Sequence, residues 1–185
     1  MKTRIAINGF GRIGRNLFRL LLNHPTIEVV AINDIADNKT MAHLVKYDSI
    51  HGVLNHKVSF SDDSIIIDDK SFLFFHEREI KNLDWKSLNI DIVIESTGKF
   101  KTFEDINQHI LAGAKKVILS APSEVDEIKT VVLGVNEHIL DGSETIISNA
   151  SCTTNNAAPM IKIIQAFCEV EQAYITTINS YTTDQ

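Results

Sequence analysis

The sequence has few of the features that mark secreted, membrane-spanning and nucleic-acid-binding proteins. Its 185 residues include two cysteines, Cys152 and Cys168, which are too few for a disulfide framework and favour a reducing compartment. No apolar run approaches the ~18 residues of a membrane-spanning helix, and the amino terminus turns polar too early for a secretory signal. The formal net charge of −6 argues against general binding to nucleic acid. We therefore expect a cytoplasmic protein with no membrane segment and no nucleic-acid partner.

The composition is that of an ordinary folded protein. Hydrophobic residues make up 44% of the chain and charged residues 23%, and the length suggests one domain of roughly 150 residues with an appendage. The seven histidines show no spacing typical of metal ligands. We expect surface or capping roles for them and no metal site.

Short β-branched runs alternate with stretches that have helical periodicity. The pattern predicts strands at residues 2–8, 28–33, 58–60, 64–67, 72–75, 91–95, 116–119, 131–135, 145–148 and 170–178, and helices at 12–22, 40–47, 103–112 and 157–167. Strands joined through helices run parallel to one another. The sequence therefore predicts an α/β fold with a Rossmann-type, doubly wound, mostly parallel sheet, whose ligands lie beyond the carboxyl ends of the strands.

A glycine-rich turn follows the first expected strand. Gly9, Gly11 and Gly14 form G-x-G-x-x-G between a strand and a helix, which is the context of a dinucleotide site. Asp34 follows 20 positions after Gly14, at the end of the second strand, where a carboxylate accepts from ribose hydroxyls and repels a 2′-phosphate. This arrangement favours NAD over NADP; the alternative is a glycine turn that only packs a strand against a helix.

Cys152 lies in the run S-N-A-S-C-T-T-N before a helical pattern. A thiol at a helix amino terminus has its thiolate stabilised by the helix dipole and is a competent nucleophile, and the flanking Ser151 and Thr153 hydroxyls suit an anionic group. The alternative is a small cysteine buried in the core, and the spacing alone leaves both interpretations open. For Cys168, on the apolar side of the helix, we expect a core position.

Several motifs together resemble the phosphorylating glyceraldehyde-3-phosphate dehydrogenase family in order and spacing. They are I-N-G-F-G-R-I-G-R, A-I-N-D, K-Y-D-S-x-H-G, A-G-A-K-K-V-I-L-S-A-P and S-N-A-S-C-T-T-N, and the resemblance covers the whole chain. It implies NAD-dependent oxidation of glyceraldehyde 3-phosphate through a covalent thioester. Inorganic phosphate then attacks the thioester to give the acyl phosphate 1,3-bisphosphoglycerate.

The resemblance also implies roles for individual residues. Cys152 corresponds to the nucleophile. The residues implied to contact NAD are Gly9, Gly11, Arg12, Ile13, Gly14, Asp34, Arg78 and Ser120. The residues implied to hold the substrate phosphate and the attacking phosphate are Ser151, Thr153 and Thr182.

The chain departs from the family pattern in two places. Asn179 stands where the family has its catalytic histidine, and Asn156 replaces a second cysteine that is not the nucleophile. An asparagine can donate a hydrogen bond but cannot carry a proton near neutral pH, so we expect impaired turnover.

The family resemblance also implies a domain organisation. Residues 1–150 are expected to form the NAD-binding domain, and residues 151–185 the beginning of an incomplete α+β catalytic domain. Three questions stay open: whether the chain is a non-catalytic NAD-binding or interaction module, whether its substrate is erythrose 4-phosphate, and whether it forms the homotetramer that the family implies.

Overall fold

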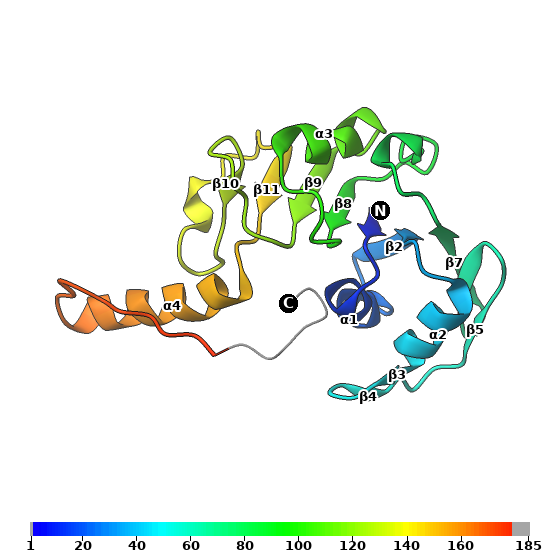
Figure 1. Cartoon of the computed structure of the whole chain (residues 1–185), viewed down its shortest axis with the longest axis horizontal. Helices are drawn as coiled ribbons and strands as arrows, with labels where there is room; N and C mark the ends of the chain where they lie inside the picture. The colour runs from blue at the N-terminus through cyan, green and yellow to red at the C-terminus, as the bar shows by residue number, and fades with distance from the viewer. Residues whose placement is uncertain (1, 179–185) are drawn as a thin grey trace.

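A computed structural model of the chain describes residues 2–178 and shows helices on both faces of one large sheet (Figure 1). The elements are β1 (Thr3–Asn8), α1 (Arg12–Leu21), β2 (Ile27–Asn33), α2 (Asn38–Lys46), β3 (Tyr47–Asp48), β4 (Gly52–Val53), β5 (Val58–Phe60), β6 (Ser64–Ile67), β7 (Lys70–Phe75), η1 (Ile80–Asn82), β8 (Ile92–Glu95), α3 (Phe103–Leu111), β9 (Lys116–Leu119), β10 (Lys129–Thr130), η2 (Glu137–Ile139), β11 (Ile146–Ser148) and α4 (Cys152–Phe167).

The sheet has the strand order β10-β11-β9-β8-β1-β2-β7-β6-β5. All neighbouring pairs run parallel except β5–β6 and β6–β7, which form the antiparallel meander expected between residues 58 and 75. From central β1 the chain passes to β2 on one side and later to β8 on the other. The predicted Rossmann-type, mostly parallel α/β sheet is therefore confirmed, and its topological switch point lies at the carboxyl end of β1.

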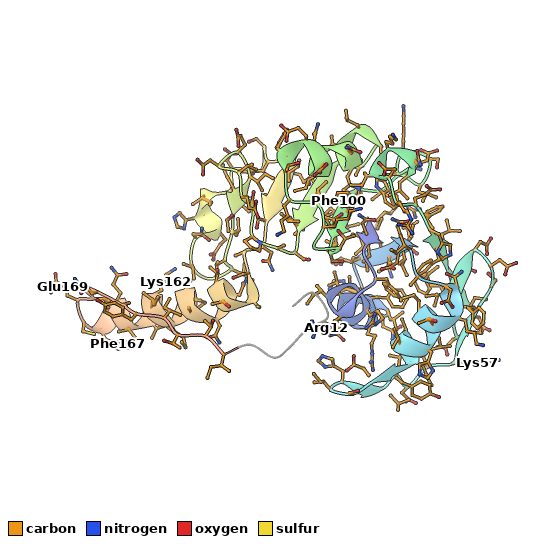
Figure 2. All side chains as sticks on the ribbon, viewed as in Figure 1. Arg12, Lys57, Phe100, Lys162, Phe167 and Glu169 are labelled. Atoms are coloured by element: carbon orange, nitrogen blue, oxygen red, sulfur yellow. The ribbon has the colours of Figure 1, made fainter. Side chains whose placement is uncertain are left out.

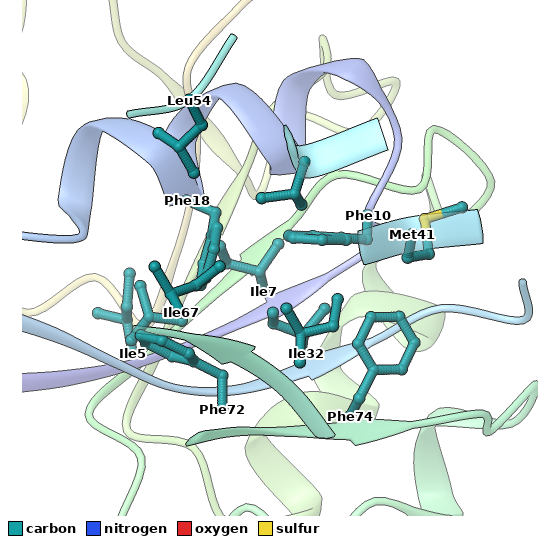
Figure 3. Close-up of a cluster of buried hydrophobic side chains, with 13 residues drawn as sticks. Ile5, Ile7, Phe10, Phe18, Ile32, Met41, Leu54, Ile67, Phe72 and Phe74 are labelled. Carbon is teal, nitrogen blue, oxygen red and sulfur yellow. The ribbon is translucent and has the colours of Figure 1, made fainter. Parts of the chain in front are cut away.

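Alternation along β1 divides the core between the two faces of the sheet. Ile5 and Ile7 belong to the cluster under α1 and α2, whereas Ala6 belongs to the cluster under α3, as the period of two in a strand requires. In the first cluster Phe10 and Phe18 meet edge to face, with ring centroids 5.4 Å apart, beside Ile7 (Figure 3). This packing fixes the start of α1 against the end of β1, where the glycine turn lies.

The strand expected at 131–135 is wrong. Only Lys129 and Thr130 pair with the neighbouring strand. A turn follows, in which the Asn136 side chain makes hydrogen bonds to the backbone. Its Oδ1 accepts from the Val132 N–H at 2.7 Å and its Nδ2 donates to the Thr130 carbonyl at 3.0 Å, while Gly134 has a φ of 81°. A β-branched run thus bends because an Asn and a Gly supply the chemistry of a turn.

Two expectations for the last part of the described chain also change. α4 begins at Cys152, five residues before the expected start, because Ser151 caps it through a hydrogen bond from the Thr154 N–H to its Oγ. The expectation of a strand at residues 170–178 is wrong: the chain there runs back beside α4 and is assigned no strand (Figure 1). A β-branched run becomes a strand only when another strand pairs with it. Within residues 2–178 no helix is long and apolar enough to span a membrane.

Candidate functional site

The carboxyl ends of β1, β2 and β8 open into a cleft of about 290 Å³. Its walls come from these strand ends, from the segment after β7 and from the loop after β8. The lining residues are Asn8, Gly9, Gly11, Asn33, Asp34, Ile35, Glu77, Arg78, Ile80, Ser96, Thr97, Lys99 and Phe100. The cleft thus lies at the switch point of the sheet, where open α/β sheets bind their ligands.

The three glycines of the turn meet different steric demands. Gly9 has a φ of 92°, and a Cβ there would lie 2.5 Å from the Thr97 nitrogen. A Cβ at Gly14 would lie 2.1 Å from the Gly9 carbonyl oxygen, whereas a Cβ at Gly11 would meet nothing within 4 Å. Gly9 and Gly14 therefore permit close backbone packing, and Gly11 leaves open space beside the first turn of α1.

That open space suits an anion. α1 begins at Arg12 with no side-chain cap and no acidic residue in its first turn, so its first N–H groups are left for another acceptor. Figure 2 marks Arg12 at the start of α1 and Phe100 in the loop after β8. The glycine turn is therefore shaped and charged for the pyrophosphate of a dinucleotide.

Asp34 is fixed to the same turn. Its Oδ2 accepts from the Phe10 N–H at 2.6 Å and its Oδ1 accepts from the Ala36 N–H at 3.0 Å. Each carboxylate oxygen keeps a further lone pair, and the side chain lines the cleft. Asp34 can thus accept from a ribose hydroxyl, and Arg78, whose position follows β7, lines the same cleft.

The other expected cofactor residues do not line the cleft. Arg12 and Ile13 are exposed at the first two positions of α1, and Gly14 is buried behind them. Ser120 follows β9, where its backbone N–H donates to the Glu95 carbonyl at 2.9 Å. These four residues surround the cleft at the carboxyl edge of the sheet rather than forming its wall.

Sequence reasoning missed a group of buried polar residues beside the cleft. Asn8, Asn33 and Glu95 end the three strands β1, β2 and β8, and all three are buried. His109 of α3 contacts Glu95 and is fully buried, so the surface role expected for it is wrong. A polar residue that ends each of three apolar runs is the sequence signal that could have located this group.

Cys152 lies away from the cleft, at a second candidate site. It is the first residue of the sixteen-residue helix α4 and is exposed, so the interpretation of a buried core cysteine is wrong. Cys168 is also exposed, and its thiol donates to the Ile164 carbonyl at 3.4 Å, so its expected core position is wrong. Figure 2 shows why: α4 extends away from the sheet, with Phe167 and Glu169 at its far end.

A groove of about 610 Å³ runs between α4 and the segment that returns beside it. Cys152, Thr153 and Asn156 form part of one wall, and residues 173–178 form the other. Ser151, which caps α4, does not line this groove. Asn179 and Thr182 lie outside the described residues.

Neither location has the donors of a metal centre. Across the part of the chain that the structure describes, no three side chains of His, Cys, Asp or Glu come together in a group that could hold a metal ion.

Comparison with known proteins gives the family directly. Residues 3–103 match the model of the glyceraldehyde 3-phosphate dehydrogenase NAD binding domain, and residues 151–185 match the model of the C-terminal domain. Glyceraldehyde-3-phosphate dehydrogenase from Geobacillus stearothermophilus is 48% identical over 186 residues, covering 100% of this chain and 55% of the relative. The enzyme of the same name from Thermotoga maritima is 50% identical over 184 residues, covering 98% and 55% respectively.

The chain thus spans about half the length of the curated relatives that it matches. More than half of the chain matches the model of the NAD binding domain. The fold and the glycine turn are those expected of a domain that binds NAD. The chain belongs to the glyceraldehyde 3-phosphate dehydrogenase family and carries its NAD-binding domain.

Proposed function

We propose that the chain serves the NAD-dependent oxidative phosphorylation of glyceraldehyde 3-phosphate to 1,3-bisphosphoglycerate, with Cys152 as the nucleophile. The observation that carries this proposal is the position of Cys152. β11 runs parallel to β9, β9 to β8 and β8 to β1, so the segment after β11 leaves the sheet at the same edge as the cleft. An exposed thiol therefore follows the sheet on the edge where the cofactor cleft opens.

The residues of this chain divide the chemistry between them. The Cys152 thiolate, at the amino terminus of α4, attacks the aldehyde carbon, and the resulting alkoxide takes a proton from water to form a hemithioacetal. NAD, when bound, supplies the capacity to accept a hydride. The hemithioacetal carbon gives up that hydride and its hydroxyl proton passes to water, which leaves a thioester on Cys152. Inorganic phosphate then attacks the thioester carbon, the thiolate leaves, and the acyl phosphate is released. Ser151, Thr153 and Thr182 provide hydroxyls for the two phosphate groups.

The cofactor contacts are assigned from the family resemblance, and the presence of Gly9, Gly11, Asp34 and Arg78 in the lining of the cleft supports them. Gly9, Gly11, Arg12, Ile13 and Gly14 form the turn and helix start that take the pyrophosphate. Asp34 takes the adenosine ribose, Arg78 lies on the adenine side, and Ser120 lies on the nicotinamide side. We assign residues 1–150 to the cofactor domain, residues 151–185 to the beginning of the catalytic domain, and the protein to the cytoplasm.

Asn179 favours a second candidate function. An asparagine at the position of the family's catalytic histidine cannot act as a general acid or base, whereas the cofactor cleft does not depend on that position, which suits an NAD-binding module with little turnover. The two candidates differ in what happens after NAD binds.

A phosphate-dependent assay separates them. Protein carrying this sequence is mixed with NAD, inorganic phosphate and glyceraldehyde 3-phosphate, with erythrose 4-phosphate in a parallel reaction, and NADH is followed by its absorbance. NADH formation that requires phosphate and stops after alkylation of Cys152 supports the proposed reaction, and the faster substrate identifies the preferred sugar phosphate. NAD-induced thermal stabilisation with no NADH formation supports the binding module instead.

We expect Gly11→Ala to weaken NAD binding at least tenfold with little effect on folding. The added methyl meets no protein atom within 4 Å, so it occupies space that the pyrophosphate needs. The check is isothermal titration calorimetry of NAD together with a thermal melt of the free protein. Leu20→Ala is the matched control, because this side chain is 78% exposed near the opposite end of α1. Equal NAD affinity in Gly11→Ala and the parent would place the pyrophosphate elsewhere.

A further inference from the structure

A chain of buried, hydrogen-bonded polar side chains runs from the wall of the cofactor cleft into the protein interior. Glu95 and His109 are 0% exposed, Asn8 is 1% exposed and Asn33 is 5% exposed. They are supplied by β8, α3, β1 and β2, so the chain crosses the middle of the sheet just behind the strand ends. Burying so many polar groups is costly unless each one is hydrogen-bonded.

The fully buried Trp85 determines which nitrogen of His109 carries the proton. The indole Nε1–H lies 3.0 Å from His109 Nδ1, and an indole can only donate. Nδ1 must therefore be the accepting nitrogen, so the single proton of a neutral imidazole is on Nε2. That N–H donates to Glu95 Oε2 at 3.0 Å.

Glu95 is satisfied entirely by such donors. Its Oε2 also accepts from Asn8 Nδ2, and its Oε1 accepts from the backbone N–H of Thr97 at 2.8 Å and from the Thr97 hydroxyl. All four donors are neutral, and together they fix the direction of both oxygens of the Glu95 carboxyl group. The Glu95 carboxyl group is therefore oriented by neutral donors rather than by a lysine or arginine.

At its other end this chain of hydrogen-bonded side chains reaches the segment that carries Arg78. Asn33 Nδ2 donates to Asn8 Oδ1 at 2.7 Å and to the Glu77 carbonyl at 2.9 Å, and Asn33 Oδ1 accepts from the Glu77 N–H at 2.9 Å. Asn8, Asn33, Glu77 and Thr97 all line the cleft. Glu95 and His109 do not line it, yet through these bonds they connect three of its walls.

We propose that Glu95 and His109 are positioning residues for NAD, an inference that rests on the proposed cofactor role of the cleft. Glu95 orients Thr97 and Asn8, Asn8 orients Asn33, and Asn33 holds the Glu77 backbone next to Arg78. His109 fixes the direction of the Glu95 carboxylate, and Trp85 fixes His109. The adenine side and the loop after β8 are thereby held in one arrangement before the cofactor arrives, which lowers the cost of binding.

Glu95→Gln tests the group in the middle of the chain that accepts hydrogen bonds from all four donors. Glutamine has the same size. In either orientation of its amide, however, an NH₂ group takes the place of a carboxylate oxygen that accepts from two donors, so two donors face a third donor. We expect the dissociation constant of NAD, measured by calorimetry on the full chain, to rise about tenfold, because the competent arrangement of the cleft becomes a minor one.

Trp85→Phe tests the chain from its far end. Phenylalanine keeps a buried ring in the core cluster and removes only the indole N–H from the chain of hydrogen-bonded side chains. Trp85 itself does not line the cleft. We expect the dissociation constant of NAD to rise about threefold, because His109 can then turn or move its proton. Ile106→Val is the matched control: it loosens the same helix as His109, is fully buried, and has no polar atom in the chain.

A spectroscopic measurement separates positioning from mere packing. Trp85 is the only tryptophan of the sequence, so emission excited at the indole band reports on the end of this chain. We expect NAD to change that emission in the parent and in Ile106→Val, and to change it by less than half as much in His109→Gln while still binding.

The outcomes are distinct. A parent that neither binds NAD nor gains thermal stability from it overturns the cofactor role itself, and the positioning role with it. A parent that binds NAD, with folded Glu95→Gln and Trp85→Phe within twofold of it, overturns only the positioning role. Where Glu95→Gln does not fold, Trp85→Phe decides. An equal loss of affinity in Ile106→Val also overturns the proposal, because packing alone would then explain it.

Discussion

Replacing Asn179 by histidine is expected to raise the rate of phosphate-dependent NADH formation by about 10²–10⁴-fold in protein that carries this sequence. The resemblance to the family assigns Asn179, in the run T-T-I-N-S-Y-T-T-D-Q, to the position of the catalytic histidine. An imidazole there takes the hydroxyl proton of the hemithioacetal and pairs with the Cys152 thiolate, whereas an amide has no proton to exchange between pH 5 and 8. The measurement is kcat for glyceraldehyde 3-phosphate, with NAD affinity determined separately.

The control for this prediction is Asn179→Gln, which keeps an amide and changes only its reach. It should leave kcat low, and Asn179→His combined with Cys152→Ala should return the rate to background. The dissociation constant of NAD should stay within about twofold in all of these variants, because the cofactor cleft is built from residues 8–100. Equal rates for the asparagine and histidine proteins would mean that another group moves the proton.

The parts of the fold that follow from local chemistry could be read from the sequence. The alternation of Ile5, Ala6 and Ile7 places β1 in the middle of the sheet with both faces covered, and Pro25 marks the end of the first helix region. The glycine turn and Asp34 were predicted as a dinucleotide site from their spacing, and the structure brings Gly9, Gly11 and Asp34 into one cleft. In each case the property depends on neighbours close in sequence or on a period.

The parts that failed depend on partners distant in sequence. His109 and Ile106 are the buried residues of α3, and nothing near His109 in the sequence indicates Glu95 or Trp85, which contact it from 14 and 24 positions away. Residues 170–178 have the composition of a strand, yet the structure assigns no strand there. The residue type indicates whether a side chain prefers the core or the surface. A buried polar group also needs a particular hydrogen-bonding partner, and which residue becomes that partner depends on the topology of the fold.

The glycine turn also provides the largest expected effect on folding. Gly14→Ala should lower the free energy of unfolding by about 3 kcal/mol, because a methyl placed 2.1 Å from the Gly9 carbonyl oxygen forces backbone to move. Relief is blocked on the other side, since the Gly9 N–H donates to the Asn33 carbonyl at 2.8 Å and the Ser96 hydroxyl donates to the Gly9 carbonyl at 2.7 Å. Urea unfolding followed by circular dichroism measures the change.

Gly11→Ala is the matched comparison, because it adds the same methyl three positions earlier where no protein atom lies within 4 Å. The two variants should therefore separate the two functions of the turn. Gly14→Ala loses stability, and loses NAD affinity because the strand end and α1 no longer pack closely; Gly11→Ala keeps its stability and loses only affinity. Unfolding curves that coincide for Gly14→Ala and the parent would show that α1 can shift away from β1 at no cost, and the close strand–helix approach would then not be what requires glycine at position 14.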